Sequence, residues 1–216
     1  SLLGKTVMIT AGPTYEKIDP VRFIGNHSSG KMGYALAEEC AERGAKVLLV
    51  SGPVSLKISH PNVERYDVTS AGEMYAKANE LFGQTDIAIL CAAVADFTPE
   101  QSYDQKVKRG VDDFVIRLKP TQDIAKSLGL QKKTGQVLVG FALETNDEET
   151  NANKKLVSKN LDFIVLNSMN DKQATFGYDT NKITIIESHG NKTEFPLKSK
   201  KEVAGDIIDK VLEYSK

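Results

Sequence analysis

A short polar run near the N-terminus has the residue types and spacing of an anion-binding loop. Residues 26–29 read Asn-His-Ser-Ser, Gly30 follows, and apolar residues then recur at helical spacing. The first N–H groups of a helix lack partners within it and favour phosphate, and a glycine lets the backbone come close to a ligand. Arg22 and Lys31 add positive charge nearby. We therefore expect this loop to bind an anionic group.

Two nucleotide-binding fingerprints come close to this loop without matching it. Residues 25–31 have the spacing of the phosphate-loop motif, but Met32 stands where that motif needs a magnesium-binding Ser or Thr. The dinucleotide fingerprint G-x-G-x-x-G is also absent, because Gly12 and Gly30 are too far apart. We interpret Gly33, three residues after Gly30, as a point of close packing between a helix and a strand.

Three further features are suited to a ligand, and each has a structural alternative. Asp96 follows the apolar run 86–93. A carboxylate beyond the carboxyl end of a parallel strand faces the usual ligand site of α/β folds. The alternative is that Asp96 caps a turn or a helix. The polar stretch 98–110, with three cations at 106–109, is either a mobile lid that carries charge over a phosphate or a solvated face. Phe141 ends a buried run and either stacks on a base or packs in the core.

Short apolar runs alternate with amphipathic segments along the whole chain. Strands are predicted at 6–10, 46–50, 63–68, 86–93, 114–118, 136–142 and 163–166, and helices at 30–44, 70–81, 121–130, 145–159 and from 199 onwards. Segments 182–187 and 192–197 flank a His-Gly-Asn turn and predict an antiparallel hairpin. Strand–helix–strand units join parallel strands. We therefore predict an α/β fold, Rossmann-like and doubly wound, with a mostly parallel sheet and an added antiparallel hairpin, as a single domain over 1–216 with its lid at about 98–110.

The bulk composition excludes several classes of protein. Lys and Arg number 28 against 29 Asp and Glu, a balance that argues against a general nucleic-acid or membrane binder. Cys40 and Cys91 fall in predicted elements and are interpreted as small buried residues, and the three scattered histidines suggest no metal site. No stretch is apolar enough to span a membrane and no signal pattern is present, so we expect a cytoplasmic protein. Because the chain begins at Ser1, almost directly on a strand, a domain excised from a longer protein is expected.

Seven blocks of the sequence resemble the phosphopantothenate–cysteine ligase family of coenzyme A biosynthesis, in its bacterial CTP-dependent form. They are ITAGPT (9–14), DPVRFIGNHSSGKMG (19–33), LVSGPVSL (49–56), CAAVADF (91–97), KVKR (106–109), GFALET (140–145) and KNLDFIVLN (159–167). The resemblance implies a two-step ligase. The carboxylate of phosphopantothenate attacks the α-phosphate of CTP, accompanied by Mg²⁺, which gives an acyl-cytidylate and pyrophosphate. The amine of cysteine then attacks the activated carbonyl and releases CMP.

The resemblance also implies roles for individual residues. Asn26 and Lys106 would be catalytic, and Arg22, Asn26, Ala92 and Ala93 would bind substrate. The nucleotide would be bound by Ser28, Ser29, Gly30, Asp96, Lys106, Gln122, Asp123, Ile124, Ala125, Phe141, Lys155 and Lys159. Two departures stand out: Arg109 replaces a lysine and keeps its charge but not its geometry, and Gln122 stands where a proline is common. The metal ligands stay unassigned.

The family resemblance implies a homodimer and, in bacteria, a fused flavin-dependent phosphopantothenoylcysteine decarboxylase outside this chain. No flavin is then expected on the chain itself, and the strands at 182–197 are the expected dimer surface, since exposed edges can pair. From the residues alone, the conclusion would be a nucleotide- or phosphate-binding α/β protein. A nicotinamide-dependent reductase and a non-catalytic binding module are the alternatives, and the choice between CTP and ATP stays open.

Overall fold

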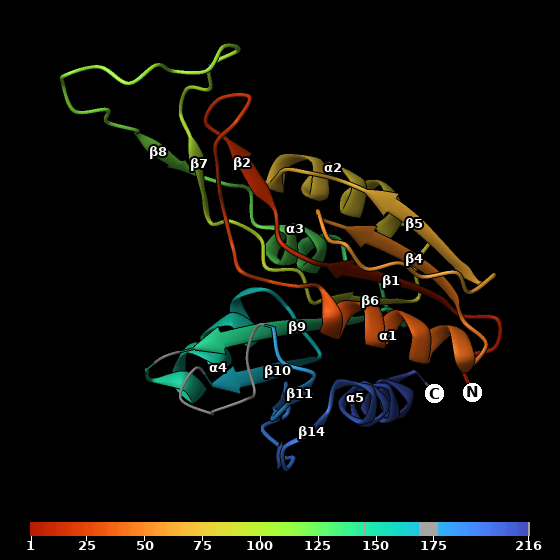
Figure 1. Cartoon of the computed structure of the whole chain (residues 1–216). Coiled ribbons are helices and arrows are strands. Elements are labelled where there is room, and N and C mark those ends of the chain that lie inside the picture. The colour runs from red at the N-terminus through yellow and green to blue at the C-terminus, as the bar shows by residue number, and fades with distance from the viewer. Residues whose placement is uncertain (145, 169–176, 216) are drawn as a thin grey trace.

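The computed structural model, which describes residues 1–144, 146–168 and 177–215, is built on one mostly parallel sheet (Figure 1). Eight strands of the described residues form this sheet in the order β13-β12-β10-β9-β6-β1-β4-β5. They are β1 (Thr6–Ala11), β4 (Lys46–Ser51), β5 (Val63–Asp67), β6 (Ile87–Leu90), β9 (Val137–Glu144), β10 (Phe163–Ser168), β12 (Thr184–Glu187) and β13 (Lys192–Glu194). The first six run parallel, whereas β12 and β13 are antiparallel and form the predicted hairpin.

The order of the six parallel strands is that of a Rossmann fold. Numbered along the chain, they lie in the order 3-2-1-4-5-6, so the winding reverses between β1 and β6. Ligands of such folds bind outside the carboxyl ends of the strands at this switch point. The prediction of a doubly wound α/β fold with an added hairpin is confirmed.

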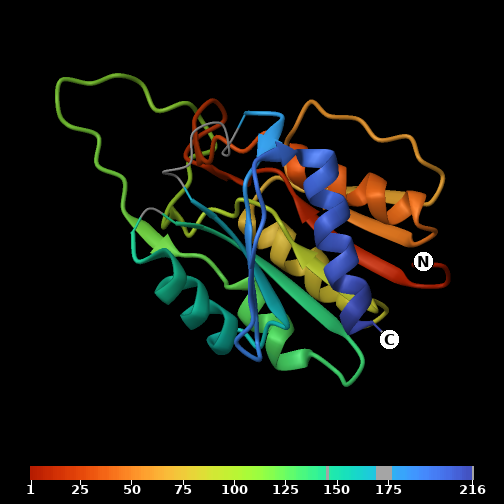
Figure 2. The same cartoon turned by 90° about the horizontal axis from the view of Figure 1, so that it is seen from below.

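Five helices of the described residues cover the two faces of the sheet. They are α1 (Lys31–Glu42), α2 (Ala71–Phe82), α3 (Ile124–Gln131), α4 (Glu148–Ser158) and α5 (Lys200–Tyr214). Helices α1 and α5 pack side by side on one face, and α2, α3 and α4 cover the other (Figures 1 and 2). Successive strand residues point to opposite faces, so Val7 and Ile9 pack under α1 and α5 while Met8 packs under α2. This alternation produces two cores, one on each face.

Local sequence signals fix the ends of the helices. Ser70 caps α2 by accepting a hydrogen bond from the N–H of Glu73 at 3.2 Å, and the Glu73 carboxylate accepts the N–H of Ser70 at 3.3 Å. These two bonds form a capping box, and Ser199 opens α5 in the same way. Gly44 follows α1 with φ +95°, the left-handed conformation that ends many helices.

The predicted strand at 114–118 is wrong. Instead β7 (Phe97–Pro99) pairs with β8 (Leu118–Pro120), and residues 97–120 form an arm that projects from the body of the molecule (Figure 1). Val115 is 77% exposed, because no neighbouring strand meets the alternating pattern on this arm. The arm extends beyond the predicted lid at 98–110.

Several shorter elements complete the chain. A small hairpin of β2 (Tyr15–Lys17) and β3 (Phe23–Gly25) leads into the polar loop, and β11 (Thr180–Asn181) pairs with β14 (Lys198–Ser199). The predicted helix start at Thr145 lies outside the described residues, and α4 begins at Glu148. Among the helices described, none has the length and apolar character needed to cross a membrane.

Candidate functional site

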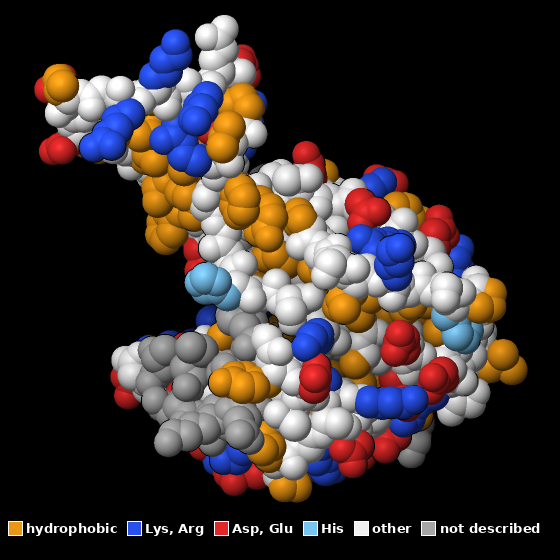
Figure 3. Space-filling model, in the orientation of Figure 1, with side chains coloured by type: hydrophobic (Ala, Val, Ile, Leu, Met, Phe, Trp, Pro, Cys, Tyr) orange, Lys and Arg blue, Asp and Glu red, His pale blue; other side chains and the backbone are white. Residues whose placement is uncertain are grey.

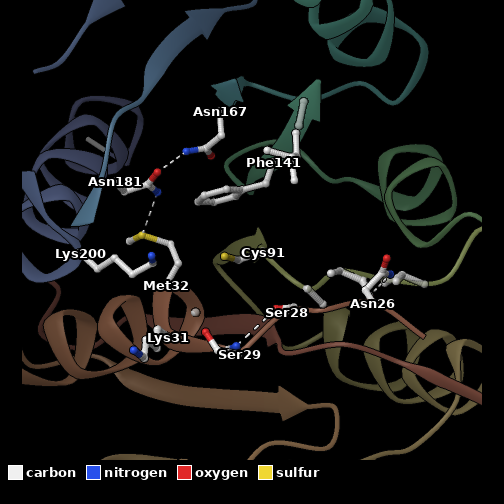
Figure 4. A pocket seen from close by; sticks show the side chains of 17 residues that line it. Asn26, Ser28, Ser29, Lys31, Met32, Cys91, Phe141, Asn167, Asn181 and Lys200 are labelled. Carbon is white, nitrogen blue, oxygen red and sulfur yellow. Dashed lines mark hydrogen bonds between the residues drawn. The ribbon is translucent and has the colours of Figure 1, made fainter. Parts of the chain in front are cut away.

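Two adjoining cavities lie at the carboxyl ends of the parallel strands, next to the switch point. The α1 cavity, of about 330 Å³, is lined by Asn26, residues 28–33, 91–94 and 141–143, Asn167, Asn181 and Lys200 (Figure 4). The Asp96 cavity, of about 290 Å³, is lined by Thr10, Leu90, Ala92, Val94, Asp96, residues 121–125, Gly140, Phe141, Lys155, Lys159, Leu161 and Ile164. Ala92, Val94 and Phe141 belong to both cavities and separate them.

Most of the predicted site residues line one or both of these two cavities. The α1 cavity brings together Asn26, Ser28, Ser29, Gly30, Ala92 and Ala93, and the Asp96 cavity brings together Asp96, Gln122, Asp123, Ile124, Ala125, Lys155 and Lys159. Phe141 stands between the two groups. Arg22 and Lys106 line neither cavity. Fourteen sequence positions thus fall into two clusters and two positions fall outside them.

The start of α1 is shaped for an anion. Gly30 is the N-cap residue, with φ +79° and no side-chain cap, so the first N–H groups of the helix are available at the cavity wall. A Cβ on Gly30 would lie 2.9 Å from Cγ1 of Val54, so the position requires glycine on both conformational and steric grounds. Gly33 packs as predicted, since a Cβ there would lie 2.5 Å from Cβ of Ala11 on β1.

Two lysines bring positive charge to the α1 cavity. Lys31 donates to Oδ1 of Asp179 at 2.7 Å, and Lys200 donates to the carbonyl of Thr180 at 3.0 Å. Burial, helped by the charge of Lys31, lowers the pKa of Lys200. Together with the helix start, these ammonium groups make the cavity attractive to an anion.

Met32, Asn167, Asn181 and Lys200 are among the residues of the α1 cavity that sequence reasoning did not predict. Asn167 Nδ2 donates to the side-chain oxygen of Asn181, and Asn181 in turn contacts the sulfur of Met32 at 3.6 Å (Figure 4). Asn167 is the one member with a usable signal, because it falls at the carboxyl end of a predicted strand. Lys200 has only the pattern of an ordinary residue in the first turn of a helix.

Carboxylates hold the cations of the Asp96 cavity. Lys159 Nζ lies 3.1 Å from Oδ2 of Asp123, and Lys155 Nζ lies 2.7 Å from Oε1 of Glu144. Asp123 also caps α3 by accepting the N–H of Lys126 at 3.0 Å. Since the described helices have other N-cap residues, Asp96 caps none of them. Its exposed carboxylate faces a polar cavity of a size that suits part of a nucleotide.

Asn26 joins the polar loop to the segment that follows β6. Its Nδ2 donates to the carbonyl of Ala93 at 2.9 Å, and the N–H of Thr14 donates to the same carbonyl at 3.3 Å. The hydroxyl of Thr14 accepts the N–H of Ala95 at 2.9 Å. These bonds hold the loops after β1, β3 and β6 against one another at the mouth of the α1 cavity.

Arg22 and Lys106 belong to the region of the arm. Lys106 is exposed on the arm. Lys and Arg side chains gather on the projecting part of the surface (Figure 3). Arg22 donates from Nη2 to Oδ2 of Asp19 at 2.5 Å and to the carbonyl of Val107 at 2.6 Å. The two predicted roles of these residues stay predictions.

The two cysteines are free thiols. Cys40 is a buried residue of α1, and Cys91 is half-buried in the wall of the α1 cavity. Burial raises the pKa of each thiol to about 12, so neither is a nucleophile near neutral pH. Within the described residues, no group of three or more His, Cys, Asp or Glu side chains could hold a metal ion.

Comparison with known proteins gives consistent matches along the chain. Residues 2–214 match the family described as DNA/pantothenate metabolism flavoprotein C-terminal domain. The chain is 49% identical over 215 residues to the coenzyme A biosynthesis bifunctional protein CoaBC of Bacillus subtilis (strain 168), covering 100% of this chain and 53% of that protein. It is 58% identical over 211 residues to a protein of an unknown prokaryotic organism named cysteine/cysteine sulfinic acid decarboxylase, covering 98% and 59%. The chain therefore spans little more than half the length of these relatives.

A solved structure shows the same architecture. The crystal structure of the C-terminal domain of the bifunctional protein CoaBC superposes with a TM-score of 0.81 at 43% identity, covering 97% of this chain and 94% of that one. The resemblance first seen in the motifs is confirmed by these matches. The chain belongs to the family of DNA/pantothenate metabolism flavoprotein C-terminal domains.

Proposed function

We propose that this domain is a CTP-dependent phosphopantothenate–cysteine ligase of coenzyme A biosynthesis. The observation that carries the proposal is the pair of adjoining cavities, which share the wall formed by Ala92, Val94 and Phe141. A carboxylate must meet the α-phosphate of a nucleotide for acyl activation, so the reaction needs two ligand sites that touch. The similarity to the C-terminal domain of CoaBC supports the same conclusion.

The two steps follow from the chemistry of the groups. A carboxylate oxygen of phosphopantothenate attacks the α-phosphorus of CTP, the bond from that phosphorus to the oxygen bridging the α- and β-phosphates breaks, and pyrophosphate leaves. The amine nitrogen of cysteine then attacks the acyl carbon, loses a proton, and CMP leaves with the acyl oxygen. Negative charge develops at both steps, so preorganised donors are the main contribution that the protein can make.

The residues of the two cavities divide this work. The N–H groups at Gly30 and the start of α1, with Ser28 and Ser29, bind phosphate. Asn26 contacts the acyl-cytidylate. Asp96, Phe141 and residues 122–125, with Lys155 and Lys159, hold the nucleotide. Lys106 supplies positive charge from the arm, and Arg22, Ala92 and Ala93 contact phosphopantothenate. Magnesium enters with the triphosphate, and no flavin is bound by this chain.

The deciding experiment measures pyrophosphate release with phosphopantothenate, cysteine and Mg²⁺, and compares CTP with ATP. Release with CTP that depends on phosphopantothenate supports acyl activation, and the ratio of the CTP and ATP rates gives the nucleotide class. Lys106→Gln should abolish turnover while the circular dichroism spectrum stays unchanged. Absence of release from folded protein with either nucleotide would refute the ligase proposal for this domain alone.

A second candidate activity comes from the name of one relative, a cysteine/cysteine sulfinic acid decarboxylase of which this chain covers 59%. Bacterial ligases of this family often follow a decarboxylase domain, and we propose that such a domain accompanies this one in the whole protein. The same reaction mixture tests the alternative, because carbon dioxide formed from cysteine without CTP would assign decarboxylation to this chain.

We also propose a cytoplasmic homodimer. The predicted contact, the strands at 182–197, is one candidate surface, although its edge strand β13 has Lys192 paired with Glu149 and Glu194 and charges on an edge strand oppose pairing. The arm is a second candidate surface, because Phe97, Phe114 and Leu118 are 51%, 44% and 43% exposed there. Light scattering with Lys192→Ala and Phe114→Ser variants tests both surfaces, and a monomeric wild type would refute the dimer.

A further inference from the structure

Asp19 is a buried carboxylate outside both cavities. Its side chain is 0% exposed, and it accepts hydrogen bonds from the backbone N–H of Val21 and Arg22, both at 2.9 Å. It also accepts Nε of Arg22 at 3.0 Å and Nη2 of Arg22 at 2.5 Å. The guanidinium of Arg22 and these N–H groups hold the pKa of Asp19 well below its usual range. The carboxylate is therefore ionised throughout the physiological pH range.

The same carboxylate reaches across to the arm. Oδ2 of Asp19 accepts the N–H of Val107 at 3.1 Å, and Nη2 of Arg22 donates to the carbonyl of Val107 at 2.6 Å. Both backbone polar groups of Val107 are thus held by one ion pair. The guanidinium of Arg22 also lies 5.9 Å from the ring centre of Phe114, farther along the arm.

The contact of Asp19 and Arg22 with the backbone of Val107, called the Asp19 clamp below, joins two predicted catalytic positions. Val107 is the immediate neighbour of Lys106, and Arg22 leads directly into β3 (Phe23–Gly25), which runs into Asn26. Asn26 lies on the wall of the α1 cavity. The position of Lys106 relative to Asn26 therefore depends on the contact between Asp19, Arg22 and Val107.

We propose that Asp19 is a positioning residue that fixes the Lys106 segment of the arm relative to Asn26. This inference rests on the proposed ligase function, in which Lys106 supplies charge to the reaction. A lysine on an unanchored loop loses conformational entropy each time it is placed at the site. The Asp19 clamp restricts this segment already in the folded protein, so less conformational entropy is lost when Lys106 is placed at the site. The reaction is then faster, because the cation is already close to its working position.

The test compares Asp19→Asn with Asp104→Asn. Asparagine keeps the shape of aspartate but places an NH₂ group against N–H donors and removes the charge that faces Arg22. Asp104 lies on the same arm with a fully exposed carboxylate whose ion pair is with Lys17 at 3.4 Å, so its variant removes an arm charge without touching the clamp. Steady-state rates for both variants are measured over a range of CTP concentrations.

We expect Asp19→Asn to lower kcat about tenfold or more, as for a misplaced catalytic group. KM for CTP should stay unchanged, because the nucleotide cavity is intact. Asp104→Asn should keep both parameters. A second readout is independent of activity: trypsin should cut after Lys106, Lys108 and Arg109 several times faster in Asp19→Asn than in the wild type or in Asp104→Asn.

A second variant guards against a folding defect at the buried site. Val107→Pro removes the N–H that Asp19 accepts and leaves the Asp19–Arg22 pair in place. It should reproduce the fall in kcat, and cleavage after Lys108 and Arg109 should speed up.

The positioning role is refuted if the clamp variants keep the wild-type kcat, or if cleavage of the arm does not change. An inactive wild type would instead refute the ligase proposal. In that case the trypsin comparison still decides whether Asp19 holds the arm.

Discussion

The contact of Gly33 with β1 leads to a prediction about both stability and activity. A Cβ at this position would lie 2.5 Å from Cβ of Ala11 and 3.1 Å from its Cα. Non-bonded carbon atoms pack at roughly 3.5–4.0 Å, so Gly33→Ala must move the first turn of α1 away from β1 by roughly 1 Å. Overpacking of this kind costs about 1–3 kcal/mol. In a domain of this size that lowers Tm by about 2–12 °C.

The same displacement reaches the site, because residues 28–33 line the α1 cavity. A misplacement of about 1 Å can lower a rate about 100-fold, and we expect pyrophosphate release to fall by up to that factor. Gly72→Ala is the matched control. Gly72 lies in the first turn of α2, and a Cβ added there would lie 3.9 Å from Oγ of Ser70. Alanine therefore fits and should raise stability by about 0.4–1 kcal/mol.

Thermal unfolding followed by circular dichroism gives both Tm values, and pyrophosphate release gives the rates. The prediction is one of opposite signs: Gly33→Ala lowers Tm and Gly72→Ala raises it. If both alanine variants raise Tm alike, α1 does not pack as closely on β1 as the structure indicates. The reasoning about helix displacement would then be wrong, whatever the activity of the protein.

Three further predictions concern titratable groups and the Asp96 cavity. Burial raises the pKa of Cys40 and Cys91 to about 12, so the free energy of unfolding should decline as pH rises above the ordinary thiol pKa. Iodoacetamide at pH 8 should label both thiols only in urea. Rapid labelling of the native protein would contradict this prediction. Because the folded-state pKa of Asp19 is depressed, the contribution of this carboxylate to stability is complete above its ordinary pKa of 3.8 and is lost as pH falls below that value. In urea unfolding, the free energy of unfolding should fall less between pH 5 and pH 3 in Asp19→Asn than in the wild type. An equal fall would exclude this carboxylate as the cause. Lys159→Met should raise KM for CTP about tenfold, the scale of one charge-assisted hydrogen bond, without changing KM for cysteine. The control Lys126→Met, at an exposed lysine, should change neither KM. Equal effects of the two variants would remove Lys159 from the nucleotide site.

Much of the fold could be predicted from the sequence because its signals are local. Beyond their first residues Thr6 and Lys46, the apolar runs at 6–10 and 46–50 are buried on both faces of the sheet, as is the run at 163–166. The Ser70–Glu73 pair is a local signal that caps a helix wherever that helix packs. The segment 114–118 shows where this reasoning fails. Alternation predicts a strand only when a neighbouring strand is present to pair with it, and residues 114–117 lie on the arm without one.

The site was predictable to the extent that it is built from contiguous loops. Residues 26–30, 92–96 and 122–125 each follow a strand or open a helix, and each occupies a cavity wall. Asn181 lies in β11 and Lys200 directly follows β14. Both line the α1 cavity although they are far in sequence from residues 28–33 on its wall. Their positions depend on long-range packing, which a pattern of polar and apolar residues does not contain.

The arm remains the part in which sequence and structure must be combined. The resemblance assigns Lys106 to the chemistry, yet the structure places it outside both cavities, on an arm held at its base by β7 and β8 and at Val107 by Asp19 and Arg22. A loop anchored at these points does not sample positions independently of its anchors. Under the proposed function we expect movement of the backbone at Lys106 to be coupled to the turn between β2 and β3, which also carries the chain to Asn26. The proposed clamp links these two segments through Val107, so we expect a change in one of them to affect the placement of the other.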